Sequence, residues 1–335
     1  MRKKHRQRKY NKQKRIIIIS LFLIITCLSI GYAAFSTGIN LNAKGNISTT
    51  PSSCFTVSDN GDGTGTITDY DVNTCGTKVI IPNNINNLTI TKIGDGSSKL
   101  IDGQRYNNGP FTEKNITSII LPNTLTYIGY IAFFGNYNVK KVTIPSSVKV
   151  IRHQAFAFNS IEDLTLNEGL TTIGSEAFSH NNLKTIRIPN SVTSMDVGTF
   201  NSNLIEGENA YIYNKNIDGS IDYTTLNSYG NRRNNNITFP SNIKVLGGQS
   251  LYLIDNLTEL NIPDTIEKLD NQFAYNNKNL TTVNIGSGIK EIESNAFYGI
   301  GNQDTLTINI NRKEDAIAGA PWGATNVNVN WTGTN

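Results

Sequence analysis

One phrase recurs along the chain at a nearly constant interval, and this repeat constrains the fold more than any other feature. The phrase is an asparagine, an aliphatic residue, two variable residues and then aliphatic-x-aliphatic, and it occupies residues 115–122, 138–145, 160–167, 182–189, 256–263 and 279–286, with Ser160 in place of asparagine once. From Pro122 to Gly286 its successive end markers are 23, 22, 22, 51, 23 and 23 residues apart. A fixed period of this length indicates a solenoid, in which each unit buries its apolar face against its neighbours.

A second fixed element follows each phrase: an aliphatic residue and then the pair Ala-Phe, as in Ala155-Phe156 and Ala177-Phe178, with the order reversed in Phe273-Ala274. The phrase alternates apolar and polar residues and predicts a short strand. The proline after it marks a corner, and Ala-Phe fills a return arc. We therefore expect the prolines to lie at equivalent corners: Pro122, Pro145, Pro189, Pro240 and Pro263. We also expect the phenylalanine rings to form one buried stack: Phe133, Phe156, Phe178, Phe200 and Phe297.

The asparagine that opens each phrase is a candidate for a structural role inside the turn. We expect its side chain to point inward and its amide to bond the backbone of the next coil, at Asn115, Asn138, Asn182, Asn256 and Asn279. The alternative is that these asparagines only favour turns.

The unit L-x-x-[IV]-x-I-P-x-[ST]-[VL]-x-x-I-x-x-x-A-F, best matched by Val139–Phe156 and Leu183–Phe200, resembles the BspA-like class of leucine-rich repeats. The resemblance covers residues 54–310. It implies a mainly β leucine-rich-repeat solenoid of short parallel strands with turn or short helical return arcs. It also implies extracellular surface proteins, several of them adhesins that bind host or partner-cell proteins, with no conserved catalytic residues.

Two hairpins divide the array. Residues 55–70 and 211–229 both alternate β-forming residues around an Asp-Gly turn, at Asp62-Gly63 and Asp218-Gly219. We expect a linker at 36–53, a hairpin with a first repeat block at 54–205, and a hairpin with a second block at 206–335. The second block should end in a cap where residues 320–323 and 327–331, with two tryptophans, depart from the repeat.

The N-terminus carries the topological signal. Residues 1–15 hold nine basic side chains and no acidic one, and residues 16–35 contain no charge. The segment 16–35 is either a cleavable signal peptide or a signal anchor at the membrane, and both export the remainder with the basic end inside. Residues 16–335 carry 21 basic and 26 acidic side chains. Because the folded part is net acidic, no nucleic-acid partner is expected.

Cys54 and Cys75 follow the apolar segment and are 21 residues apart. In an oxidising compartment they can form a disulfide. The alternative is two unpaired thiols.

Catalytic and metal-binding patterns are absent from the sequence. The three histidines, His5, His153 and His180, have no cysteine or carboxylate at metal-ligand spacing, and there is no G-x-S-x-G, H-E-x-x-H or phosphate-binding glycine loop. We predict a non-catalytic protein without a cofactor.

The outward positions of the strands should align into a polar surface, where solenoids bind partners. The second hairpin adds aromatic side chains, which either contact a partner or pack the hairpin on the solenoid. The candidate binding residues are Thr143, Thr165, Arg187, Thr238, Asn261 and Asn284 in one column, Lys141, Asp163 and Glu259 in the next, and Tyr211, Tyr213, Tyr223 and Tyr229 on the hairpin.

These features predict an exported cell-surface protein that binds an extracellular protein of a host, a matrix or a neighbouring cell. If the segment 16–35 is not cleaved, it also anchors the chain in the membrane. The alternatives are an envelope structural or assembly protein and a glycan-binding module.

We predict cleavage near Ala33, because Gly31 and Ala33 supply small residues and the apolar core of residues 16–30 is only 15 residues long. Intact-mass measurement of the exported protein should then give a mature N-terminus near Ala34. A species that retains residues 1–33 would show instead that the segment is an anchor.

Overall fold

The computed structural model describes residues 49–334 except 102–103, 301–305 and 315, and these residues belong to one compact unit, Thr49–Asn335. The predicted basic tail, the apolar segment 16–35 and most of the linker lie outside the described residues. Within the described ranges no helix has the length and apolar character needed to cross a bilayer.

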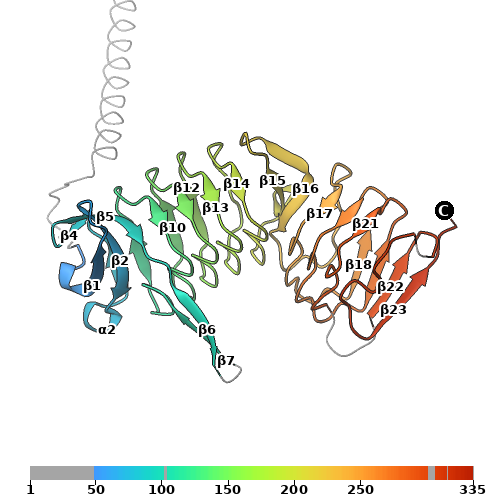
Figure 1. Cartoon of the computed structure of the whole chain (residues 1–335), viewed down its shortest axis with the longest axis horizontal. Helices are drawn as coiled ribbons and strands as arrows, with labels where there is room; N and C mark the ends of the chain where they lie inside the picture. The colour runs from blue at the N-terminus through green and yellow to red at the C-terminus, as the bar shows by residue number, and fades with distance from the viewer. Residues whose placement is uncertain (1–48, 102–103, 301–305, 315, 335) are drawn as a thin grey trace, which may run out of the picture. The chain divides into compact units, whose positions relative to one another are not determined.

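Each repeat forms one coil of a solenoid, and successive coils pair through parallel strands. The repeated phrase forms the face that we call the strand face. Its three sheets are β3 (Lys78–Ile80) with β8 (Ser118–Ile120), β10 (Lys141–Ile144) with β12 (Asp163–Leu166), and β18 (Glu259–Ile262), β20 (Thr282–Ile285), β22 (Leu306–Ile310) and β23 (Val327–Trp331) in that order (Figure 1).

A second face is formed by the residues after each proline corner. In the first block an eight-stranded sheet follows the order β1-β2-β5-β9-β11-β13-β14, with β4 beside β5. Its strands are β1 (Phe55–Asp59), β2 (Thr64–Tyr70), β4 (Asn84–Ile85), β5 (Leu88–Ile93), β9 (Tyr127–Ile128), β11 (Val150–Ile151), β13 (Thr172–Ile173) and β14 (Ser194–Met195). A five-stranded sheet follows in the second block, made of β15 (Tyr211–Lys215), β16 (Ile221–Tyr229), β17 (Val245–Leu246), β19 (Lys268–Leu269) and β21 (Glu291–Ile292).

The corners are equivalent, as the repeat predicts. In each of them the proline carbonyl accepts a hydrogen bond from the N–H three residues later, at 3.1–3.3 Å, for Pro122, Pro145, Pro189, Pro240 and Pro263. Both predicted hairpins are present, because β1 pairs antiparallel with β2 and β15 pairs antiparallel with β16. A third hairpin, β6 (Ser97–Ile101) with β7 (Gln104–Asn108), was not predicted and extends away from the neighbouring coils in Figure 1.

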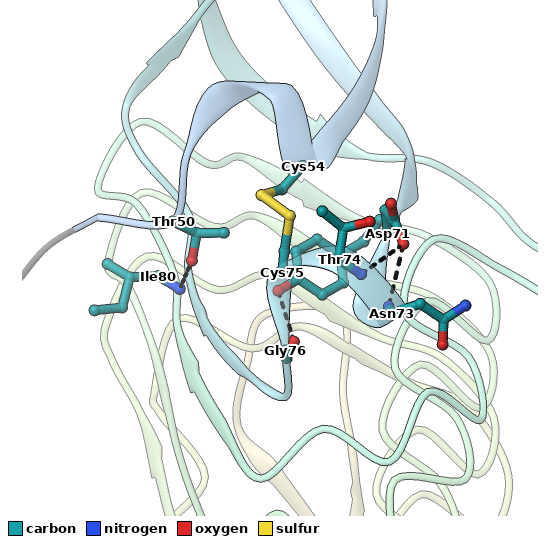
Figure 2. The surroundings of a disulfide bond; sticks show 9 residues. Thr50, Cys54, Asp71, Asn73, Thr74, Cys75, Gly76 and Ile80 are labelled. Atoms are coloured by element: carbon teal, nitrogen blue, oxygen red, sulfur yellow. Dashed lines mark hydrogen bonds between the residues drawn. A yellow bond between two sulfur atoms is a disulfide. The ribbon is translucent and has the colours of Figure 1, made fainter.

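Helix contributes little to the described unit. The short segments are η1 (Ser52–Cys54), α2 (Val72–Cys75) and η2 (Gly207–Ala210). Cys54 and Cys75 are joined by a disulfide (Figure 2), and their Cα atoms are 5.9 Å apart. Asp71 caps α2 by accepting hydrogen bonds from the N–H groups of Asn73 and Thr74, both at 3.1 Å. The disulfide therefore fixes the first hairpin at the N-terminal end of the solenoid core.

The return arcs contain left-handed residues that the sequence pattern did not reveal. In one arc Ile131 has φ 47°, and in the next Gln154 has φ 53° and Phe158 has φ 56°. Non-glycine side chains rarely adopt this conformation, which costs about 1–3 kcal/mol per residue. The cost is offset because the arcs then bond each other, as when Phe133 N–H donates to the Ala155 carbonyl at 2.8 Å. The predicted return arcs are thus turns held by the next coil.

A column of buried asparagine amides joins these arcs, but not at the predicted positions. Its members are the residues that follow the second left-handed residue of each arc: Asn136, Asn159, Asn181, Asn203 and Asn277. The Asn181 side-chain N–H₂ donates to the carbonyls of Phe156 in the preceding coil (2.9 Å) and Phe178 in its own (3.1 Å). Its Oδ1 accepts from the Ile161 N–H at 3.0 Å. Each amide therefore satisfies backbone groups of two coils.

The prediction for the asparagines that open the phrases was wrong. Asn115, Asn138, Asn256 and Asn279 are exposed and Asn182 is half-buried. Most of the phrases contain two or more asparagines within a few residues, and the repeat period alone does not indicate which of them lies inside the turn.

Phenylalanine rings fill the interior next to the asparagine column. Phe111, Phe133, Phe156, Phe178 and Phe200 are fully buried and stack nearly parallel, with centroids 4.8–5.6 Å apart. The expected single stack is nevertheless wrong. Leu251 takes the ring position in the first regular coil after the second hairpin, and Phe297 belongs to a separate group with Phe273 and Trp322.

The C-terminal residues continue the solenoid more closely than predicted. Residues Val327–Trp331 do not depart from the repeat, since β23 pairs in parallel register with β22. Trp322 is buried against Phe297 and Trp331 and closes the interior at this end. The block boundary predicted at residue 206 stays a prediction.

Removing one buried amide should destabilise the solenoid strongly. We expect Asn181→Ala to lower the free energy of unfolding by about 3 kcal/mol, because the buried Ile161 N–H loses its partner and the Phe156 and Phe178 carbonyls each lose one of two side-chain donors. Asn138→Ala, at an exposed asparagine, is the control and should change it by less than about 0.5 kcal/mol. Urea unfolding of both variants checks this, and equal losses would show that the column is not structural.

Candidate functional site

Four predicted outward residues of the first block, on β10 and β12, lie in register. Lys141 pairs with Asp163 across β10 and β12, and the Lys141 Nζ is 2.5 Å from the Asp163 carboxylate. Thr143 faces Thr165 in the same pair of strands. This part of the strand face is therefore a flat polar surface with balanced charge.

The second block carries a ladder of exposed and half-buried asparagines on its strand face. Asn284 donates to the Asn261 side-chain oxygen at 2.8 Å and to Glu259 at 3.0 Å. Asn309 donates to Asn284 at 2.7 Å, and Asn330 donates to Asn309 at 2.9 Å. The last two residues were not predicted, although they lie in the same column. Because each amide bonds the next, much of its hydrogen-bonding capacity is already used.

Arg187 and Thr238 do not join these columns, and the expectation of one continuous strand face is wrong. Their phrases, residues 184–188 and 236–239, contain no strand. The second hairpin is inserted between these two coils and keeps their phrases from pairing. Tyr211 lies beside the second phrase, and its hydroxyl donates to the Thr238 carbonyl at 2.6 Å.

The four hairpin tyrosines differ in their surroundings. Tyr229 is 1% exposed and accepts a hydrogen bond from Asn234 at 2.7 Å, so it belongs to the core and its assignment to a binding surface was wrong. Burial raises the pKa of its hydroxyl to about 12. Tyr211 packs on Tyr229 with ring centroids 5.2 Å apart. Tyr213 contacts Tyr223 edge to face at 5.2 Å, and Tyr223 is 57% exposed.

A groove of about 780 Å³, which we call the junction groove, lies where the two blocks meet. Its first wall is the phrase of the last first-block coil, with Ile186, Arg187 and Ile188. Its second wall is the second hairpin, from which Tyr211, Ile212, Tyr213, Lys215, Ile221 and Tyr223 line the groove. The sequence-predicted Arg187, Tyr211, Tyr213 and Tyr223 thus come together here.

Apolar side chains surround the groove as well as lining it. Ile217 at the hairpin tip is 94% exposed, and Ile221 is also exposed. Leu164, Leu166, Ile186 and Ile188 are only partly buried, although the equivalent Val142 and Ile144 in β10 are buried. The solenoid interior is therefore partly open to the groove. Clusters of exposed apolar side chains commonly mark interaction sites.

A second aromatic column crosses the junction on the outside of the return arcs. It consists of Phe134, Phe158, His180, Tyr252, Tyr275 and Tyr298, with successive ring centroids 3.9–6.0 Å apart. Two of the five successive contacts are stacked, Phe158 with His180 and Tyr275 with Tyr298, while two are tilted and one is edge to face. Unlike the buried phenylalanines, these rings therefore do not form one continuous parallel stack.

His180 occupies the block junction within that column. Its ring lies 3.9 Å from that of Phe158, and its Nδ1 is buried with no hydrogen-bond partner among the described residues. Burial and the nearby Arg232 guanidinium lower the pKa of His180 to about 4. Within the described part of the chain no cluster of three or more His, Cys, Asp or Glu side chains could hold a metal ion.

The sequence matches the family profile described as "BspA type Leucine rich repeat region", in six copies over residues 104–221 and 208–316, which together are more than half of the chain. No curated protein matches it. Similar solved structures include a leucine-rich repeat protein from Bacteroides ovatus (18% identity, 83% of this chain and 89% of that chain covered, TM-score 0.42). A leucine-rich cell surface protein from Faecalibacterium prausnitzii is similar at 19% identity, covering 87% and 97%, with TM-score 0.36. The leucine-rich repeat protein of T. pallidum is similar at 18% identity, covering 73% and 85%, with TM-score 0.40.

The partly buried His180 predicts a loss of stability in acid. The unfolded chain binds a proton at His180 below its ordinary pKa of 6.5, whereas the folded chain binds it only near pH 4. The contribution of neutral His180 to the free energy of unfolding is therefore complete above pH 6.5 and is lost as the pH falls through 4. The total loss is about 3 kcal/mol. Urea unfolding at pH 7 and pH 4 checks this. Between the two pH values the free energy of unfolding should decrease less for His180→Phe than for the wild type. Equal decreases would mean that His180 does not titrate at the junction.

Proposed function

Because the chain belongs to the BspA-type leucine-rich repeat family, we propose that its folded part is the ectodomain of a cell-surface protein that binds an extracellular protein partner without catalysing a reaction. The family supports a repeat protein of the cell surface. The partner, the adhesive role and the export by residues 1–35 belong to the proposal.

The observation that carries the proposal is the exposed apolar surface at the junction groove. Tyr223 is 57% exposed and Ile217 94% exposed, and both lie on the hairpin that forms one groove wall. Protein-binding sites concentrate their energy in a few aromatic and arginine side chains at the centre of an apolar patch. Tyr213, Tyr223 and Arg187 supply these residue types within one groove. The polar columns of the strand face offer no such anchor.

An envelope assembly role would use the same surface, with a protein of the producing cell as the partner. The test therefore includes both sources. The full-length protein, purified in mild detergent, is used to capture proteins from a panel of host matrix proteins and from the envelope of the producing cell.

Loss of the exposed ring should weaken capture. We expect Tyr223→Ser to reduce the affinity for the captured protein by about ten-fold or more, since an aromatic anchor at the centre of an interface commonly contributes above 1 kcal/mol. Tyr137→Ser is the matched control, because Tyr137 is 59% exposed but lies on a return arc of the first block. Capture of no protein, or equal effects of the two substitutions, would contradict the proposal.

A further inference from the structure

We propose that the junction groove accepts an extended, acidic segment of the partner protein as an additional β-strand. This inference rests on the proposed protein-binding function and specifies how the partner is recognised. It depends on three features of the groove: unpaired backbone on both walls, apolar side chains at alternate positions, and two cationic side chains that form no ion pair among the described residues.

The first wall has a strand sequence without strand pairing. Residues 185–188 match Asp163–Leu166 of β12 in the repeat. In the same coil, the residues before and after them bond the preceding coil normally, since Asn182 N–H donates to Ile161 and Thr193 N–H donates to Thr171. Yet, within the described chain, the N–H groups of Thr185, Ile186, Arg187 and Ile188 donate no backbone hydrogen bond. Unpaired strand backbone is the template that an added strand uses.

The second wall is also a sheet edge. β15 (Tyr211–Lys215) is the terminal strand of the five-stranded sheet and pairs only with β16. It does not pair with β14, the last strand of the first block's sheet. The unpaired residues 186–188 and the edge strand β15 therefore line one groove. An extended segment placed between them could pair with either edge.

The apolar lining has the spacing of a strand. Ile186 and Ile188 are two residues apart on the first wall, and Tyr211 and Tyr213 are two residues apart on the second. Side chains at this spacing lie on one face of a strand. They would contact every second residue of an added strand, so the segment should alternate apolar and polar residues.

The charge at the groove favours acidic residues among the polar ones. Arg187 and Lys215 line it, with Glu208 as the carboxylate among the lining residues. Neither cation forms an ion pair within 4.0 Å in the described part of the chain, and the Lys215 Nζ donates instead to the Gly219 carbonyl at 2.7 Å. By contrast, Lys140, Lys141, Lys268 and Lys290 are all paired with carboxylates. Electrostatic complementarity of this kind fixes specificity and register more than affinity.

A peptide selection tests the proposal directly. The full-length protein in mild detergent is used to select from a phage-displayed library of random peptides of about nine residues, long enough for one strand. The enriched peptides are synthesised, their affinities measured, and the exchange of backbone amides followed with and without peptide. We expect enriched sequences to alternate apolar and acidic residues. Their binding should slow exchange at residues 185–188 or 211–215 by about ten-fold or more.

Charge reversal separates the groove from other surfaces. Arg187→Glu should lower the affinity for the acidic peptides by about ten-fold or more. Arg152→Glu, at an exposed arginine after β11 on the second face, should leave it unchanged. Enrichment of no peptide, binding without slower exchange at either wall, or equal affinities for the two variants would overturn the proposal.

The proposed function can survive that outcome. If the full-length chain captures a partner in a manner that depends on Tyr223 while no strand is added at the groove, only the mode of recognition is wrong. If no partner is captured, the protein-binding function itself is wrong.

Discussion

The buried asparagine amide of each return arc is the interaction on which the remaining structure depends. The arcs carry left-handed residues, so their backbone groups cannot be satisfied within a single coil. A side-chain amide carries donors and an acceptor on one planar group. The Asn159 N–H₂ donates to the carbonyls of Phe133 and Phe156, and its Oδ1 accepts from the Asn136 N–H, at 2.8–3.1 Å. Each coil is thereby held at a fixed distance from the last. That distance leaves room for one phenylalanine ring per coil, which explains the parallel stack beside the amides.

The same column explains where the array changes. In the coil after the second hairpin the asparagine position is taken by Ile254, which cannot bond the preceding arc. Arg232 partly replaces it, because its guanidinium donates to the carbonyls of Asn181 and Ser202, both at 2.7 Å. The Arg232 side chain, which comes from the inserted segment, thus holds the return arcs together. It does not cause the strand phrases on the opposite side of the coil to pair. The sheets end there, and the apolar interior opens into the junction groove. The candidate site thus lies where the repeat is interrupted.

The sequence predicts the parts of the structure that repeat. Proline corners, strand phrases, the two Asp-Gly hairpins and the inward position of Phe133, Phe156 and Phe178 all follow from period and alternation. The repeat period does not report the sign of φ, so the left-handed conformation of Ile131 and Phe158 could not be predicted from it. For the same reason it could not show that Asn181, and not Asn182, is the buried asparagine of its arc. The hairpin of β6 and β7 has a local signal, Asp102-Gly103 between two polar strands, that was not recognised. Tyr229 and the broken strand face depend on how the inserted hairpin packs, which residue types alone do not specify.

Backbone hydrogen exchange of the free chain, resolved to single amides, tests most directly whether this column holds the coils together and whether the strand face is open at the junction. The amides of Ile161 and Leu183, which donate to Asn181 and Asn203, should exchange only with global unfolding. The amides of Ile186, Arg187 and Ile188 should exchange with little protection. Equal protection of the two groups would mean that the strand face is continuous across residues 185–188, and would contradict both the open junction and the role given to the asparagine column.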